Sequence, residues 1–136
     1  MSVSLNSVLE QQLLTNRFEK EVKSNLNLTL TQLQILNKVK DVDGSISISD
    51  VKKLVPAPQP AISSSVKHLA KEGYILKERS VEDERTVFLK LRESNQERIS
   101  EIFDEVELYL DEIFNEKPKQ EELQDEETSQ DEEKDA

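Results

Sequence analysis

Two groups of polar side chains in the middle of the chain have the types and spacing to contact nucleic acid. The first lies in residues 59–73, QPAISSSVKHLAKEG, where Ile62, Val66 and Leu69 recur at helical spacing. If these three face inward, the side chains that face outward are Ser64, Lys67, His68 and Lys71, with Gln59 and Ser63 near the N-terminal tip. Glutamine can hydrogen-bond adenine, serine can bond several base edges and lysine neutralises phosphate. An ordinary solvated helix face carries the same residue types, so this helix alone leaves both interpretations open.

The second group surrounds an acidic turn. Residues 74–80 and 86–92, YILKERS and TVFLKLR, alternate apolar and polar side chains and predict a hairpin with VEDER at its tip. Lys77, Arg79 and Arg85 lie beside this tip, where an arginine can enter a narrow A·T-rich minor groove with its deep negative potential. A charged exposed turn is common in soluble proteins. The position of this hairpin after a helix-turn-helix favours the nucleic-acid interpretation.

Capping and breaking residues mark the elements that must position both groups. A capping box of Thr29 and Gln32 predicts a helix start, and Asp43-Gly44 predicts a turn before a brief strand at Ser45–Ile48. Ser47 and Asp50 open a short helix that Pro56 and Pro58 end. Pro60 lies in the first turn of the following helix, and Gly73 ends that helix. Residues 5–18 carry apolar side chains at helical spacing and predict a further helix. The predicted order is helix, helix, short strand, helix, helix, hairpin and long helix. This fold class is mainly α with a small β-hairpin (α+β), a winged helix-turn-helix with an extra helix at each end.

The last predicted helix is long and amphipathic. Ser94 and Glu97 form a capping-box pattern at its start, and residues 94–116 carry apolar side chains at three- and four-residue steps. The acidic opposite face is most simply a solvated surface, whereas the length of the apolar stripe suggests a partner helix. Residues 117–136 hold one leucine and no other large apolar side chain, and nine of the twenty are acidic, which predicts a disordered acidic tail. We therefore expect one domain over residues 1–116 and a tail over residues 117–136.

Composition argues against most other chemistry. The 136-residue chain has no cysteine, one histidine and two glycines, which leaves no disulfide, thiolate metal site or glycine-rich phosphate loop. The carboxylates show no paired base or ligand pattern, so we expect no enzyme activity, no metal site and no cofactor. No apolar run approaches the ~20 residues of a membrane helix, and no secretory signal pattern is visible, so we expect a soluble cytoplasmic protein without membrane contact.

The net charge of −11 argues against nucleic acid only when it is read as an average. Residues 1–47 are neutral, whereas residues 48–92 carry nine basic and six acidic side chains. Residues 93–116 carry one basic and nine acidic side chains, and residues 117–136 carry three and nine. The basic segment is the one that holds both candidate groups. The acidity elsewhere therefore weakens non-specific binding without excluding specific contacts.

Residues 28 to about 98 resemble the MarR-type winged-helix transcription regulators, and among them the staphylococcal accessory regulator (SarA-like) branch. The similar stretches are LTLTQLQIL, the Gln-Pro start of the helix that ends SVKHLAKEGYI, and KERSVEDERTVFLKL. The last is the most specific, because a strand, an Asp-Glu-Arg wing and a Thr-Val start of the next strand recur in that branch.

The resemblance implies a homodimer in which residues 59–72 enter a major groove of double-stranded DNA and the wing enters the adjacent minor groove. Positions that match the family are Gln59 and Lys67 on the helix, and Arg79, Asp83, Glu84 and Arg85 in the wing. The residues expected to join the subunits are Leu5, Leu9, Leu13, Ile102, Val106, Leu110 and Ile113. We expect an A·T-rich, roughly palindromic site. The oxidation sensing of some relatives cannot operate here because the chain has no cysteine.

A second interpretation keeps the winged helix as a scaffold for protein interaction. The acidity of residues 93–136 motivates it, since the acidic helix and tail would bind a basic partner or oppose DNA binding. A small-molecule effector, as in many MarR-type proteins, has no marker in the sequence and stays unassigned.

Overall fold

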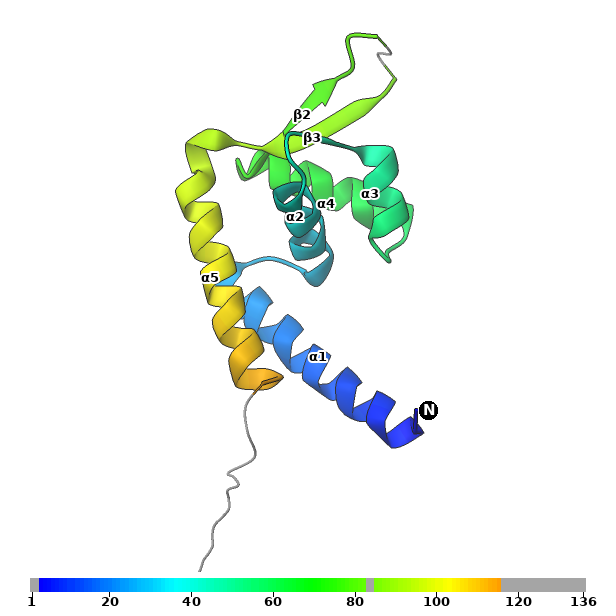
Figure 1. The fold of residues 1–136 in the computed structure, drawn as a ribbon, viewed down its shortest axis with the longest axis vertical. Coiled ribbons are helices and arrows are strands. Elements are labelled where there is room, and N and C mark those ends of the chain that lie inside the picture. Colours follow the sequence, from blue (N-terminus) through cyan, green and yellow to red (C-terminus); the bar gives the residue numbers. More distant parts are fainter. Residues whose placement is uncertain (1–2, 83–84, 116–136) are drawn as a thin grey trace, which may run out of the picture. The chain divides into compact units, whose positions relative to one another are not determined.

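The computed structural model describes residues 3–82 and 85–115 and has its helices and strands in the predicted order. The elements are α1 (Leu5–Leu26), α2 (Leu30–Asp41), β1 (Ile46–Ser47), α3 (Ile48–Leu54), α4 (Gln59–Lys71), β2 (Ile75–Arg79), β3 (Val87–Leu91), a 3₁₀ turn (Glu93–Asn95) and α5 (Gln96–Ile113) (Figure 1). The fold is mainly α with a small antiparallel sheet, which confirms the predicted class. The predicted tail, residues 117–136, lies outside the described residues.

The chain divides into two compact units. The smaller one contains residues up to 18 and from 106 onward, and the larger one contains Glu19–Glu105. Helices α1 and α5 therefore each contribute residues to both units. In the smaller unit, the rings of Phe18 and Phe114 meet edge to face with 6.1 Å between their centroids. The single domain expected for residues 1–116 stays a prediction, because two compact units can still fold as one cooperative domain.

The start of α2 is set by a complete capping box, as the sequence predicts. The Thr29 Oγ1 atom accepts a hydrogen bond from the Gln32 amide at 3.1 Å, and the Gln32 Oε1 atom accepts one from the Thr29 amide at 3.0 Å. Each residue thus satisfies a backbone donor that the first helical turn leaves unpaired. The helix that follows buries Leu33, Ile35, Leu36 and Val39.

The core of the larger unit lies between α2, α4 and the sheet. Ile35 and Leu36 of α2 are fully buried, and α2 contacts both α4 and β3. Strands β2 and β3 contribute the fully buried Ile75 and Leu89. Each such side chain contributes about 1.5–3 kcal/mol relative to an exposed position. The apolar core therefore fixes the helix-turn-helix and the root of the hairpin together.

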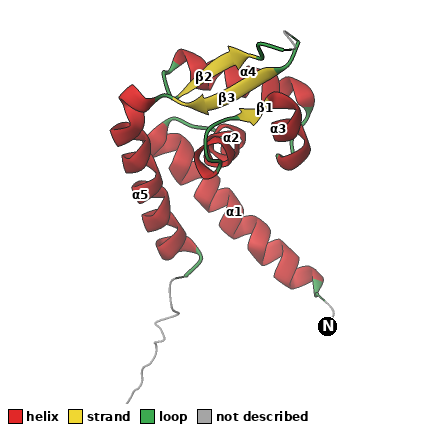
Figure 2. Ribbon diagram, turned by 45° about the horizontal axis from the view of Figure 1, so that its top comes forward, coloured by secondary structure: helices red, strands yellow, loops and turns green. Residues whose placement is uncertain are grey.

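The sheet has three antiparallel strands in the order β1-β3-β2 (Figure 2). The predicted hairpin pairs Ile75 with Leu91 at its root and Arg79 with Val87 toward its tip. The brief strand β1 pairs Ile46 with Leu89 on the other side of β3. Strand β3 is therefore central, and it links the hairpin to the segment that starts α3.

Helix α5 is shorter than its sequence pattern predicts, because it begins later and ends earlier. It runs from Gln96 to Ile113 instead of over residues 94–116, and Ser94 lies in the preceding 3₁₀ turn. In that turn the Asn95 amide donates to the Arg92 carbonyl at 3.0 Å. The Ser94 and Glu97 pattern therefore did not locate the first helical residue, because the chain leaves β3 through a tighter turn.

Replacing Thr29 with alanine tests how much the capping box stabilises the protein. Thr29→Ala leaves the Gln32 amide without its acceptor, and we expect the free energy of unfolding to fall by about 1 kcal/mol in urea denaturation followed by circular dichroism. The control is Thr31→Ala, which lies inside the first turn of α2 and replaces threonine with a better helix former. Equal losses in the two variants would contradict a specific role for the cap.

Candidate nucleic-acid interface

Helix α4 turns one face to the core and the other to solvent. Ile62, Val66 and Leu69 are buried, and so is Ser65, a polar residue that the spacing argument did not identify. The residues that the sequence places outward and that are exposed are Gln59, Ser63, Ser64, Lys67 and Lys71. His68 is half-buried, so less of its ring is available to a partner.

The N-terminus of α4 carries no side-chain cap. Pro58 occupies the N-cap position without a side-chain hydrogen bond, and Pro60 lies in the first turn. The Ser64 hydroxyl donates to the Ala61 carbonyl at 3.3 Å. The positive end of the helix dipole therefore lies beside the exposed Gln59 side chain, an arrangement that favours negatively charged groups.

A concavity joins α3, the start of α4 and the root of the wing. We call it the wing groove; its lining residues are Ile48, Ser49, Lys52, Gln59, Arg85, Thr86 and Val87. It brings together two of the predicted residues, Gln59 and Arg85. Both ionisable residues among those that line it, Lys52 and Arg85, are cationic. The wing groove can therefore accept an anionic group between the helix and the hairpin.

Sequence reasoning missed three polar residues of the wing groove. Ser49 and Lys52 belong to α3, and Thr86 directly precedes β3. The signal was partly present, because Ser49 and Lys52 lie three residues apart and share one helix face. What the sequence could not supply was the proximity of that face to the wing.

The wing separates its charges between the two faces of the sheet. Lys77 and Arg79 lie on the same face of β2 as the buried Ile75, since alternate strand residues share a face. Glu78 points to the opposite face, where its carboxylate lies 3.1 Å from the Lys90 ammonium. The face of β2 that carries Ile75 therefore also carries Lys77 and Arg79, whereas Lys90 of β3 lies on the opposite face.

The tip of the wing is only partly described. The Ser80 amide donates to the Thr86 carbonyl at 2.9 Å, and the Glu82 amide donates to the Ser80 hydroxyl at 3.2 Å. Val81 is fully exposed. The predicted wing residues Asp83 and Glu84 lie outside the described residues.

The residues predicted to join two subunits fall into two groups. Leu5, Leu9 and Leu13 of α1 are 71%, 52% and 65% exposed. Ile102 is 0% exposed, Val106 and Ile113 are also buried, and Leu110 is half-buried. The three leucines of α1 can contact a partner directly in this conformation, whereas the buried residues support the helices from inside. Sequence reasoning missed the exposed Leu108 of α5.

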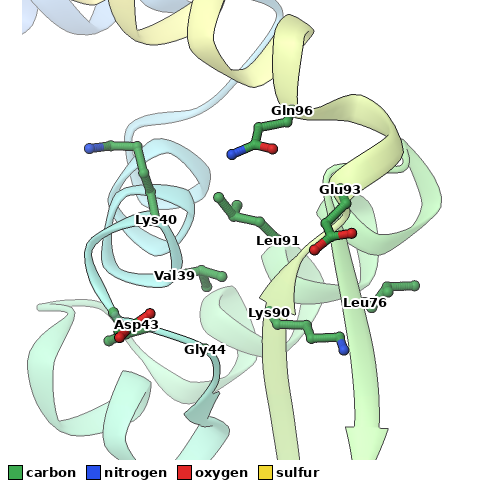
Figure 3. Close-up of a pocket in the computed structure, with 10 residues that line it drawn as sticks. Val39, Lys40, Asp43, Gly44, Leu76, Lys90, Leu91, Glu93 and Gln96 are labelled. Atoms are coloured by element: carbon green, nitrogen blue, oxygen red, sulfur yellow. The ribbon is translucent and has the colours of Figure 1, made fainter.

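A second concavity lies between the end of α2, the strands and the start of α5 (Figure 3). Its lining includes the apolar Val39 and Leu91 and the cationic Lys40 and Lys90. The Lys40 ammonium lies 3.1 Å from the Asp41 carboxylate and 4.9 Å from the centre of the Phe103 ring. The Lys90 ammonium is paired with Glu78. The lining also includes Asp43 and Glu93, so the charges around this concavity are mixed and assign no ligand class to it.

The described residues contain no group of three or more histidine, cysteine or acidic side chains that could hold a metal ion. None of the helices in residues 3–82 and 85–115 is both long and apolar enough to span a membrane.

Comparison with known proteins gives consistent matches. The family model described as "Transcriptional regulator SarA/Rot" matches residues 17–102. The chain is 29% identical over 114 residues to YwhA of Bacillus subtilis, described as an uncharacterized HTH-type transcriptional regulator, and the match covers 78% of this chain and 82% of YwhA. It is 22% identical over 107 residues to the HTH-type transcriptional regulator SarR of Staphylococcus aureus, with 78% and 93% covered.

A solved structure of a mutant MarR from E. coli complexed with operator DNA shares the fold, with a TM-score of 0.67 at 16% identity over 82% of this chain and 81% of that one. The family match, residues 17–102, runs from α1 into α5 and includes the wing groove, α4 and the hairpin. Both curated relatives are described as HTH-type transcriptional regulators. The chain belongs to the SarA/Rot family of transcriptional regulators.

Proposed function

We propose that this protein is a dimeric, sequence-specific DNA-binding regulator that uses α4 as its recognition helix. The observation that carries the proposal is the wing groove, where Lys52 and Arg85 flank the exposed start of α4. The positive end of the α4 dipole, which has no side-chain cap, and two cations favour a phosphate group at this position. The MarR structure in complex with operator DNA supports the same use of the fold.

The outward face of α4 supplies the side chains for reading bases. Gln59 can form a bidentate pair with adenine, and Ser63 can bond several base edges in the major groove. Lys67 and Lys71 lie on the same exposed face of α4 and neutralise phosphates on either side of the major groove. A helix of this width enters the major groove of B-form DNA, whose base edges distinguish all four base pairs.

The wing reaches the neighbouring minor groove in this proposal. Arg79 and Arg85 lie on either side of its tip, and a narrow A·T-rich groove concentrates negative potential that attracts arginine. Two copies of α4 in a symmetric dimer read half-sites about one helical turn apart, which is why we expect a palindromic site. No small-molecule effector is proposed.

The charge distribution favours DNA over the protein-interaction alternative for residues 48–92. This segment has a basic excess, and its cations line a groove without a carboxylate among the described lining residues. The acidic remainder of the chain repels phosphate, so binding depends on specific contacts more than on overall attraction.

Removing one groove cation tests the proposal directly. We expect Lys52→Ala to weaken binding to an A·T-rich duplex and to reduce the slope of log K against log salt by about one unit, because one phosphate contact is lost. Fluorescence anisotropy across a salt series measures both quantities. The matched control is Lys53→Ala, which removes the same charge from an exposed position on α3 outside the wing groove. If both variants behave alike, or if the unaltered protein binds no duplex at low salt, the proposal fails.

Replacing the wing arginine tests minor-groove binding. We expect Arg85→Ala to lower affinity more for duplexes whose flanks are A·T-rich than for duplexes with G·C-rich flanks, because only the former have a narrow, strongly negative minor groove. Paired titrations with two duplexes that differ only in these flanks measure the preference. An equal loss on both duplexes would indicate a phosphate contact only and would contradict minor-groove insertion.

Placing charge on the exposed face of α1 tests the dimer. We expect the unaltered chain to sediment at twice its 15.6 kDa mass, and Leu9→Glu with Leu13→Glu to sediment as a monomer, because carboxylates cannot be buried unpaired in an apolar interface. Analytical ultracentrifugation gives the mass directly. The control is Gln11→Glu, an exposed polar position on the same helix that should leave the dimer intact. A monomeric unaltered protein would contradict the dimer.

A further inference from the structure

The end of the recognition helix is closed by local backbone hydrogen bonds. The Gly73 amide donates to the Ala70 carbonyl at 3.1 Å, and the Tyr74 amide donates to the Leu69 carbonyl at 3.0 Å. Gly73 has a φ of +83°, the left-handed conformation that this helix-ending motif requires. These bonds end α4, but they join only neighbouring residues and do not fix the helix relative to the rest of the unit.

The next two carbonyls are tied to the turn that starts α5. The Gly73 carbonyl accepts a hydrogen bond from the Asn95 Nδ2 atom at 3.1 Å, and the Tyr74 carbonyl accepts one from the Arg92 amide at 3.0 Å. We call Gly73, Tyr74, Arg92 and Asn95 the junction clasp. It connects Gly73 and Tyr74, the two residues after the C-cap of the recognition helix, to a turn about twenty residues further along the chain, just before the first residue of α5.

We propose that Asn95 is a positioning residue that sets the orientation of α4 through the junction clasp and thereby supports base reading. This proposal rests on the proposed DNA-binding function. The burial of Ile62, Val66 and Leu69 fixes which face of α4 meets the core, and the junction clasp adds a second constraint at the C-terminal end of the helix. A hydrogen bond is directional, and the one from Asn95 acts on the Gly73 carbonyl, two residues after the last residue of α4.

The packing around the clasp agrees with a positioning role. A Cβ atom at Gly73 would lie 3.8 Å from the Asn95 Nδ2 atom and 4.0 Å from the Arg92 Nε atom, so the side chains of both clasp residues lie in ordinary contact range of Gly73. The Arg92 Nε atom is buried and has no hydrogen-bond partner among the described residues. A buried donor without a hydrogen-bond partner lowers the stability of the fold, and proteins keep such unsatisfied groups mainly at functional sites.

Asn95 can be tested without disturbing the backbone bond of Arg92. The probes are the duplex that the unaltered protein enriches from a randomised library and a G·C-rich duplex that it does not enrich. We expect Asn95→Ala to weaken binding to the enriched duplex about three- to tenfold, the usual worth of one hydrogen bond, and to leave binding to the G·C-rich duplex unchanged. A misoriented helix loses base contacts, whereas phosphate contacts tolerate it.

The matched control is Ser94→Ala, an exposed neighbour in the same 3₁₀ turn. Urea denaturation of both variants gives the fraction folded under the assay conditions. If Asn95→Ala weakens both duplexes in proportion to its unfolded fraction, or if it matches Ser94→Ala, then Asn95 has no positioning role.

A second measurement needs no DNA. The chain has no cysteine, so Lys67→Cys on α4 and Glu97→Cys on α5 give a uniquely labelled pair of exposed positions within the larger unit. Electron–electron double resonance on labelled protein diluted with an excess of unlabelled protein, so that spin pairs within one chain dominate, then reports the distance between α4 and the start of α5. We expect Asn95→Ala to broaden or shift this distribution, and an unchanged distribution would overturn the proposal. If the unaltered protein enriches no duplex, the DNA-binding proposal fails, and this measurement still decides whether the clasp orients α4.

Discussion

The burial of one face of α4 against the core is the constraint on which the proposed interface depends. Ile62 and Leu69 are fully buried, and α4 packs on α2. Because successive helical residues are separated by a fixed rotation, burying these positions decides that Gln59, Ser63 and Lys67 face solvent. Turning the helix would expose apolar side chains worth about 1.5–3 kcal/mol each. The surface that meets DNA in our proposal is thus a consequence of the core.

A second constraint brings the wing and α3 together. Ser47 pairs with Phe88 in the sheet, and its hydroxyl also accepts the Asp50 amide at 3.1 Å as the N-cap of α3. One residue therefore ends β1 and starts α3, which holds α3 beside β3. This short connection places Lys52 near Arg85 and creates the wing groove.

Much of the fold could be predicted because its signals are local. The capping box of Thr29 and Gln32, the helix stop at Gly73 and the alternating strands of the hairpin each depend on residues close in sequence. The start of α5 could not be predicted from Ser94, because the turn before it is shaped by contacts with the end of α4.

The candidate site also has one part that could be predicted from local sequence and one part that could not. The outward face of α4 follows from helical spacing, so its exposed residues could be predicted. The presence of Ser49 and Lys52 in the wing groove could not be predicted, because it depends on the pairing of β1 with β3. That pairing joins segments about forty residues apart in the sequence. The burial of Ile102 was also beyond the sequence pattern, which marks an apolar face without telling whether the same chain or a second one covers it.

The acidity of the whole chain and the basic wing groove together limit how the protein can bind DNA. The net charge of −11 gives little general attraction, so affinity must come from a small, defined surface. The most direct test is an NMR titration of the ¹⁵N-labelled protein with an A·T-rich duplex. We expect the perturbed amides to cluster in α3, α4 and the hairpin and to spare the acidic face of α5. Perturbations confined to α5, or none at low salt, would contradict the proposed interface.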